Sequence, residues 1–181
     1  NADGTDGDLC PLQEGYSAID RLGCPDADED GYSDPADAWT VDEGADAFPS
    51  DDSQWRDSDL DGFGDNPAPA KMADVCPMTH GTSTEDRLGC PDTDDDGWSD
   101  DGDTFVFDIT QWADGDSDGY GDNPAPATAP DGCPDVWGNS TLDSLGCLDS
   151  DGDGWSEASD PYPNDKLLWS DDDGDGYADQ S

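Results

Sequence analysis

The chain has little that would let it build an apolar core, and it has almost no positive charge. Against 49 Asp and Glu residues stand 5 Lys and Arg residues and a single His, for a formal net charge of −44 at pH 7 over 181 residues. Only 31% of the residues are hydrophobic, and no apolar run is long enough for a transmembrane helix. Nucleic acids and anionic membranes are bound through basic patches, which this sequence lacks. We therefore expect neither nucleic acid nor membrane insertion.

The same composition is typical of a disordered chain, because so little apolar surface cannot offset the conformational entropy lost on folding. Gly and Pro number 22 and 14 and interrupt every candidate helix or strand. Divalent cations that neutralise the acidic side chains are the obvious alternative source of stability. We expect little regular secondary structure beyond single helical turns at 51–55, 108–112 and 164–169, each opened by an Asp or Asn that can cap it.

The six cysteines form three pairs with one spacing, which is the first sign of an internal repeat. Each pair is separated by 14 residues, and Trp55, Trp112 and Trp169 recur every 57 residues. An even count at a repeated spacing indicates local disulfides formed in an oxidising compartment, each contributing about 3 kcal/mol in the chain-entropy description. The sequence contains no Cys-x-x-Cys motif. The expected disulfides are Cys10–Cys24, Cys76–Cys90 and Cys133–Cys147.

The repeat divides the chain into three copies of one unit, at 1–66, 67–123 and 124–181. Each copy reads as a Cys-Pro loop, a first acidic loop, a short aromatic segment and a second acidic loop. The first copy carries nine additional residues, which we place in a surface insertion near 35–45. Because each unit can contact only its neighbours, the expected architecture is one elongated, rod-like array of loops, stabilised by metal and disulfides.

Six segments match the pattern Asp-x-Asp-x-Asp-Gly-aromatic-x-acid. Calcium takes six to eight oxygen ligands, and alternating Asp residues on a tightly turning backbone can direct three carboxylates at one centre. The Gly permits the turn, the aromatic residue offers its carbonyl oxygen, and the acid at position nine adds another oxygen. The expected ligands of the first-type loops, which follow a Gly-Cys, are Asp26, Asp28, Asp30, Tyr32, Asp34 and Asp37; Asp92, Asp94, Asp96, Trp98, Asp100 and Asp103; and Asp149, Asp151, Asp153, Trp155, Glu157 and Asp160. The expected ligands of the second-type loops are Asp57, Asp59, Asp61, Phe63 and Asp65; Asp114, Asp116, Asp118, Tyr120 and Asp122; and Asp171, Asp173, Asp175, Tyr177 and Asp179.

The second-type loops lack an acid at position twelve, so they must borrow a ligand. The expected donors are Asp51, Asp108 and Asp165, just upstream of each loop. The loops carry more negative charges than six divalent ions can neutralise. We therefore expect at least six Ca²⁺, with some carboxylates shared between neighbouring ions. The alternative is a solvated acidic surface. Magnesium requires stricter octahedral geometry, and zinc prefers Cys or His; His80 is interpreted as an ordinary loop residue.

The segment from Cys76 to Asp100, CPMTHGTSTEDRLGCPDTDDDGWSD, resembles thrombospondin type 3 repeats, particularly those of secreted microbial proteins. The resemblance covers essentially the whole chain. It implies calcium wrapped by irregular backbone, two ions in many repeats, and an extracellular structural or adhesive role. The 14-residue cysteine spacing departs from the vertebrate pattern, so the vertebrate packing order is not carried over. Dockerins share the loop pattern but follow it with an amphipathic helix bearing paired leucines, of which only 166–169 gives a hint.

These features predict a secreted, non-enzymatic protein that is extracellular or attached to a cell surface. The spacing from Asp179 across a junction to Cys10 of another copy is 12 residues, against 11 within the chain, and Asp3, Asp6 and Asp8 are placed to assist a neighbour's last loop. We therefore expect head-to-tail assembly into a filament. The alternative is a calcium-dependent adhesion or glycan-binding spacer that uses the recurring aromatic residues. Asn139 begins a glycosylation sequon.

Overall fold

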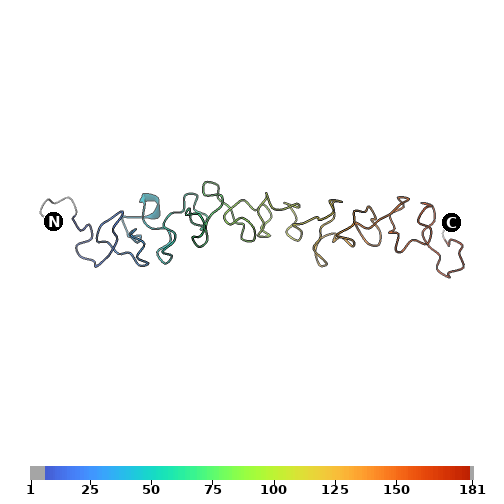
Figure 1. Cartoon of the computed structure of the whole chain (residues 1–181), viewed down its shortest axis with the longest axis horizontal. Coiled ribbons are helices and arrows are strands. Elements are labelled where there is room, and N and C mark those ends of the chain that lie inside the picture. Colours follow the sequence, from blue (N-terminus) through green and yellow to red (C-terminus); the bar gives the residue numbers. More distant parts are fainter. Residues whose placement is uncertain (1–6, 180–181) are drawn as a thin grey trace. The chain divides into compact units, whose positions relative to one another are not determined.

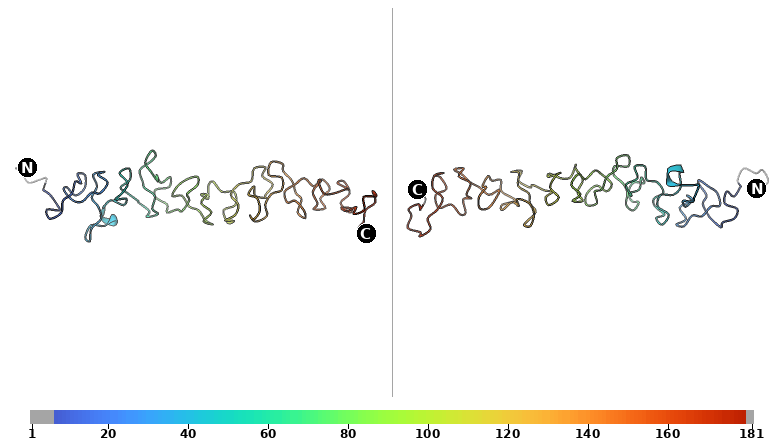
Figure 2. Two further views of the ribbon diagram at one scale, coloured as in Figure 1. Left: turned by 90° about the horizontal axis from the view of Figure 1, so that it is seen from below. Right: turned by 180° about the vertical axis from the view of Figure 1, so that it is seen from behind.

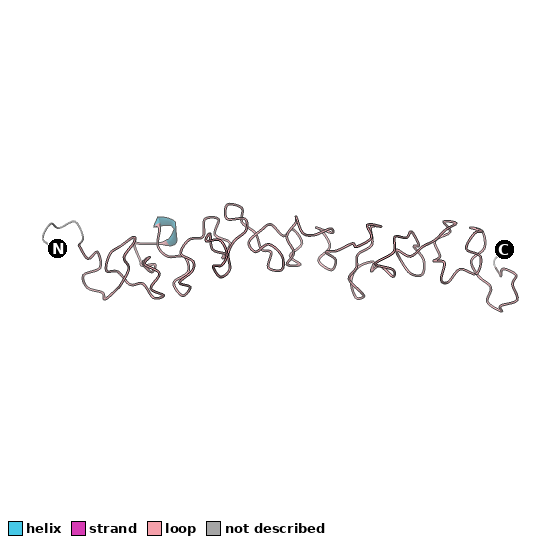
Figure 3. Cartoon of the chain, viewed as in Figure 1, coloured by secondary structure: helices cyan, strands magenta, loops and turns pink. Residues whose placement is uncertain are grey.

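The computed structural model describes residues 7–179 and contains almost no regular secondary structure (Figures 1 and 3). Within that range the only helix is a single turn of 3-10 helix, η1, at Val41–Glu43. There is no β-strand in the described residues, and three isolated bridges join Ala36 to Trp39, Gly64 to Ala73 and Gly121 to Pro130. The described part of the chain also has no helix that is long and apolar enough to cross a membrane. The fold is thus irregular, as the composition predicts.

The chain separates into two compact units, Asn1–Ser99 and Asp100–Ser181. The boundary lies inside the second of the three expected copies, so copies and units do not correspond one to one. In both views of Figure 2 the trace of each unit is a succession of short loops.

Carboxylates take the place of secondary structure as partners of the backbone amides. The Asp57 side chain accepts hydrogen bonds from the amides of Leu60 (2.7 Å) and Gly62 (2.9 Å), and Asp61 accepts one from Phe63 (2.9 Å). The same three bonds recur in each of the other five acidic loops. Short polar side chains that bond to nearby amides compete with helices and sheets, which explains why neither forms.

All three expected disulfides are present, and they close tight loops. They join Cys10 to Cys24, Cys76 to Cys90 and Cys133 to Cys147, and no described cysteine is free. The second cysteine of each pair is buried. A Cβ on Gly81 would lie 2.0 Å from the carbonyl carbon of Cys90, so only glycine fits where the loop packs against the backbone of its second cysteine. The disulfide-stabilised loops are therefore confirmed.

Two buried glutamines hold the segments that follow the second-type loops, and the sequence reading did not identify them. Gln54 is fully buried; its amide donates to the carbonyl oxygens of Asn66 (3.0 Å) and Lys71 (2.9 Å), and its Oε1 accepts from the Asn66 amide (2.9 Å). Gln111 makes the corresponding bonds to Asn123 and Thr128 in the other unit. The only sequence signal was their recurrence one residue before a repeated Trp.

The expected helical turns are wrong as helices, although each forms one hydrogen-bonded turn. The amide of Gln54 donates to the carbonyl of Asp51 (2.9 Å), and Asp51 Oδ1 accepts from the Ser53 amide (3.1 Å), but the chain does not continue helically. Turns at 108–111 and 165–168 are alike. Helix η1 instead lies in the 35–45 insertion, where Thr40 and Glu43 form a capping box.

Candidate metal centres

The acidic loops share one arrangement of their carboxylates. In several of the position-three and position-five carboxylates, one oxygen accepts a backbone amide and the other is buried without a hydrogen-bond donor, whereas the position-one Asp accepts amides on both oxygens. Asp30 Oδ1, for example, accepts from the Tyr32 amide at 2.8 Å, while its Oδ2 has no partner. Buried, donorless oxygens of this kind are found on Asp28, Asp30, Asp46, Asp59, Asp74, Asp94, Asp116, Asp131, Asp151 and Asp153. An uncompensated buried carboxylate oxygen is costly, so these oxygens are candidate ligands for a cation.

In the first loop of the chain, carboxylate oxygens of Asp26, Asp28 and Asp30 lie within 4.8 Å of one another. Burial raises the pKa of Asp30, and the charges of Asp28 and Asp26 raise it further. The pKa of Asp28 is raised by burial and then by Asp26. Like charges held this close favour either a proton or a metal ion.

The fourth carboxylate of this cluster comes from Asp46 and not from Asp37. Asp46 is only 1% exposed and its Oδ2 has no donor, whereas Asp37 is exposed. Burial raises the pKa of Asp46 to about 7, with further contributions from the charges of Asp30, Asp28 and Asp34. The 35–45 insertion places Asp46 nine residues further along the chain than Asp37, and the structure favours Asp46 over the predicted Asp37 as the position-twelve acid.

Hydrogen bonds identify Asp46 as the equivalent of the position-twelve acids in the other copies. Asp46 Oδ1 accepts the amide of Phe48 (2.7 Å), as Asp103 accepts that of Phe105 (2.6 Å) and Asp160 that of Tyr162 (2.7 Å). Asp160 is also buried, with 7% of its surface exposed.

Replacing Asp46 with Asn is expected to weaken calcium binding at the first loop by on the order of tenfold or more, because the loop loses one charged ligand. Asp37→Asn is the matched control, since it removes the same charge from an exposed position nine residues away. Calorimetric calcium titration of both variants measures the difference. Equal losses in the two variants would contradict the assignment.

The second-type loops receive their additional carboxylate from the following Cys-Pro loop. Asp74, two residues before Cys76, is 7% exposed; its Oδ1 accepts the Cys76 amide (2.6 Å) and its Oδ2 has no donor. Burial raises the pKa of Asp74 to about 6, and the charges of Asp61, Asp59 and Asp65 contribute.

The other unit repeats this geometry with Asp131, whose amide partner is Cys133 (2.7 Å). Burial raises the pKa of Asp131, as do the charges of Asp118, Asp116 and Asp122.

The upstream acids expected to supply this ligand have another role. Asp51 Oδ1 accepts from both the amide and the hydroxyl of Ser53, and Asp108 does the same with Thr110. The Ser53 hydroxyl is the main cause of the lowered pKa of Asp51, which also lies 3.5 Å from the Lys71 ammonium. These side chains cap turns, so Asp74 and Asp131 are the better candidates for ligands.

In the third copy, Asp149, Asp151 and Asp153 form a cluster with oxygens within 4.8 Å of one another. Burial raises the pKa of Asp151, followed by the charges of Asp153, Asp160 and Asp149. The chain's last loop, 171–179, keeps its internal amide bonds but is largely exposed.

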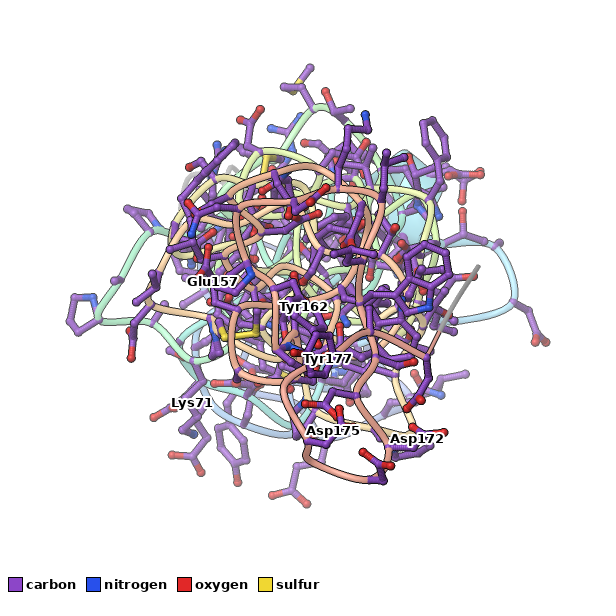
Figure 4. All side chains as sticks on the ribbon, turned by 90° about the vertical axis from the view of Figure 1, so that its right-hand side faces the viewer. Lys71, Glu157, Tyr162, Asp172, Asp175 and Tyr177 are labelled. Carbon is purple, nitrogen blue, oxygen red and sulfur yellow. A yellow bond between two sulfur atoms is a disulfide. The ribbon has the colours of Figure 1, made fainter. Side chains whose placement is uncertain are left out.

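Tyr162 and, in the last loop, Asp175 and Tyr177 are labelled in Figure 4. Burial raises the pKa of Tyr162, and the charges of Asp171, Asp175, Asp179 and Asp173 raise it further. The phenol of Tyr162 therefore lies within the field of the acids of the last loop.

The second copy's first loop lies at the unit boundary. Asp92, Asp94 and Asp96 offer oxygens within 4.8 Å of one another in the first unit. Asp100 and Asp103 belong to the second unit, and their part in this loop stays a prediction.

The carbonyl oxygens expected as ligands are available. In the described part of the chain, no hydrogen bond uses the carbonyl oxygens of Tyr32, Phe63, Tyr120, Trp155 or Tyr177. Their amides, in contrast, are all held by the position-five Asp of the same loop. The residue is thus held in place through its amide, while its carbonyl oxygen accepts no hydrogen bond.

A supporting Asp–Ser pair behind each first-type loop was not predicted. The carboxylate of Asp20 accepts both the amide (3.0 Å) and the hydroxyl (2.6 Å) of Ser33, which is fully buried. Burial works to raise the pKa of Asp20, but the Ser33 bonds outweigh it and lower the pKa. The pairs Asp86–Ser99 and Asp143–Ser156 repeat the arrangement.

No family model matches the chain, and no curated protein matches it either. The functional meaning of these loops therefore comes from their geometry and chemistry.

Proposed function

We propose that the chain is a calcium-loaded structural repeat protein, with the ions in place of an apolar core. The observation that carries this proposal is the set of buried, donorless carboxylate oxygens that face one another in the acidic loops. Hard oxygen donors, available carbonyls and mixed carboxylate geometry suit Ca²⁺. The repeated loops, including Asp46, Asp74 and Asp131, provide for at least six ions and support more.

The proposed setting is extracellular, because three disulfides persist in oxidising compartments and extracellular calcium keeps modules of about 10⁻⁴–10⁻³ M affinity loaded. The recurring hydrogen bonds support an array of three related copies, in line with the resemblance to thrombospondin type 3 repeats. No catalytic role is proposed, since the clustered carboxylates are assigned to metal.

We further propose that copies of the chain assemble head to tail. Asp8 is built like Asp74 and Asp131: its Oδ1 accepts the Cys10 amide (2.8 Å), and the amide of Leu9 donates to Leu22 (2.9 Å) as that of Val75 does to Leu88. Asp74 faces a preceding second-type loop, whereas the Asp8 carboxylate is exposed.

The exposed 171–179 loop has the hydrogen bonds of the loops that Asp74 and Asp131 complete. A second copy that presents this loop to Asp8 would reproduce the internal junction. Asp3 and Asp6, also expected to assist, lie outside the described residues.

Assembly is expected to be calcium-dependent and to require Asp8. In millimolar calcium, sedimentation of the native protein should show large species that Asp8→Asn shifts toward monomer, because the junction loses a charged ligand. Asp52→Asn, at an exposed acid between loops, is the control. Monomer at every calcium concentration would refute assembly, and the intact mass of the native protein would reveal a longer array.

One observation favours a second candidate function, calcium-dependent adhesion to a glycan or a cell surface. Tyr32 and Trp55 stack with ring centroids 5.0 Å apart, and they line a pocket of about 480 Å³ beside η1. Aromatic rings and polar groups in one hollow suit a sugar. Binding on a glycan array that Trp55→Ala abolishes would support this function; no binding would leave the aromatic pair as packing.

A further inference from the structure

The second-type loop of the first copy differs from its counterparts by a histidine. One ligand atom each of Asp59, Asp61 and His80 lies within 4.8 Å of the others. His80 comes from the Cys-Pro loop of the next copy, some twenty residues along the chain. Sequence reading treated it as an ordinary loop residue, because nothing local indicated that it returns to the acidic loop.

The backbone on both sides of His80 is fixed against this acidic loop. The amide of Gly81 donates to Asp61 Oδ2 at 3.1 Å. The amide of Thr79 lies close enough to the Asp59 carboxylate to lower its pKa, against the larger effects of burial and of the Asp61 charge, which raise it. The imidazole therefore sits between two residues whose amides already face the carboxylates.

Two carboxylates at this place face inward without donors. Both oxygens of Asp59 are buried and have no hydrogen-bond partner. Asp74 is more than nine-tenths buried and its Oδ2 is unpartnered. It lies beside Asp61, because Asp74 Oδ1 and Asp61 Oδ2 are 2.3 and 3.1 Å from where a Cβ on Gly89 would stand. The unpartnered Asp74 oxygen is an indication of a cation that does not depend on the acidic cluster itself.

The donor set favours a different ion from that of the other loops. Calcium binds oxygen, whereas an imidazole nitrogen beside carboxylates suits zinc and other borderline divalent metals. Ligands of zinc lie about 2.0–2.2 Å from the ion and hence within about 4.4 Å of one another. Ligand atoms that all lie within 4.8 Å of one another admit that geometry.

The corresponding positions in the other two Cys-Pro loops have no histidine. The junction in the other unit has the same backbone, with the Gly138 amide donating to Asp118 Oδ2 at 3.1 Å, but the residue before that glycine is Trp137. The corresponding position in the first Cys-Pro loop is Glu14. An imidazole is therefore present at one junction only.

We propose that Asp59, Asp61 and His80, with Asp74 beside them, form a site for zinc or a similar borderline divalent cation, distinct in selectivity from the calcium loops. Asp59, Asp61 and Asp74 also belong to the second-type loop proposed to hold calcium, so zinc would share these carboxylates with a calcium ion or displace it. The site stands whether or not the other five loops bind calcium. Because it links the acidic loop of one copy to the Cys-Pro loop of the next, zinc there would fasten that junction specifically.

The test is zinc titration of the calcium-loaded protein, followed by NMR of the imidazole. His80 is the only histidine, so its ring resonances need no assignment. Zinc is expected to shift these resonances and to bind on the order of tenfold or more tightly to the wild type than to His80→Ala. His80→Trp, which copies the other junction, should behave like His80→Ala, and Asp52→Asn, at an exposed acid outside the site, should keep the zinc response.

The His80→Ala variant measures the zinc affinity that the carboxylates have without the imidazole. Unmoved ring resonances, or equal zinc affinity in the wild type and His80→Ala, would overturn the proposal. A separate calcium titration keeps the two proposals distinguishable: a zinc response without calcium binding would refute the calcium function and leave this site intact.

Discussion

Removing calcium is expected to unfold the chain at neutral pH while its disulfides remain intact. At a tenfold excess of free calcium over Kd each site contributes about 1.4 kcal/mol, so six sites contribute about 8 kcal/mol. That is comparable with the whole net stability of an ordinary domain, about 5–15 kcal/mol. The formal charge of −44 would then act as self-repulsion. Near-ultraviolet circular dichroism of the seven tryptophans, before and after chelation with excess EGTA, measures the loss.

Returning calcium should restore the tryptophan signal, because the disulfides keep each Cys-Pro loop closed. Magnesium at the same concentration is the control, and it should restore the signal poorly, since it requires octahedral geometry and retains its waters. A tryptophan spectrum that chelation leaves unchanged would show that the disulfides and buried polar bonds suffice.

Acid is expected to restore order to the metal-free chain and to destabilise the calcium-loaded one. The pKa values of Asp46 and Asp74 are raised to about 7 and about 6, chiefly by burial. A carboxyl whose folded pKa lies above its unfolded value of 3.8 contributes stability that is complete below pH 3.8 and is lost as the pH rises through 6 and 7. Calcium requires the ionised carboxylates, so its contribution has the opposite dependence.

Three other carboxyls set the lower end of the pH range in which the metal-free chain is most ordered: Asp20, Asp86 and Asp143. Hydrogen bonds from Ser33, Ser99 and Ser156 outweigh burial and lower the pKa of these carboxyls. Their contribution is present above pH 3.8 and falls as they protonate below it. The metal-free chain should therefore be most ordered between about pH 4 and 6. Circular dichroism of resin-treated protein across this range is the measurement.

One variant separates the two effects. Asp46→Asn should make the metal-free chain more ordered at pH 7.5, because the buried negative charge is gone, and should make the calcium-loaded chain less stable. Asp37→Asn, at the exposed position, should change neither. If the metal-free wild type were as ordered at pH 7.5 as at pH 4.5, the buried carboxylates would have to be paired in some way that the structure does not contain.

Many features of this fold depend only on residues that are close together in the sequence, and those features were predictable. The 14-residue cysteine spacing predicted the three disulfides, and the Asp-Gly pattern predicted the clusters around residues such as Asp30 and Asp151. Each of these features needs only a few neighbouring residues and one tight turn. Composition likewise predicted the lack of helices and strands, because Gly, Pro and Asp together leave no uninterrupted stretch.

What sequence reasoning missed depends on contacts between segments. Asp74, His80 and the fully buried Gln54 all reach a loop from another part of the chain. Asp74 and Gln54 have counterparts in another copy, but the sequence does not show which loop they contact. Asp46 was missed because an insertion broke the count from the loop's first residue. In each case the sequence does not show which distant segment a side chain contacts. In the structure, the burial of a polar side chain reveals that contact.

The most direct test of the central claim is to count the ions on the folded protein by native mass spectrometry in millimolar calcium. At least six Ca²⁺ per chain are predicted, one or more of which Asp46→Asn should remove. A folded chain that carries no calcium, or only a broad distribution that Asp46→Asn does not change, would contradict the account and leave the acidic loops as a solvated surface.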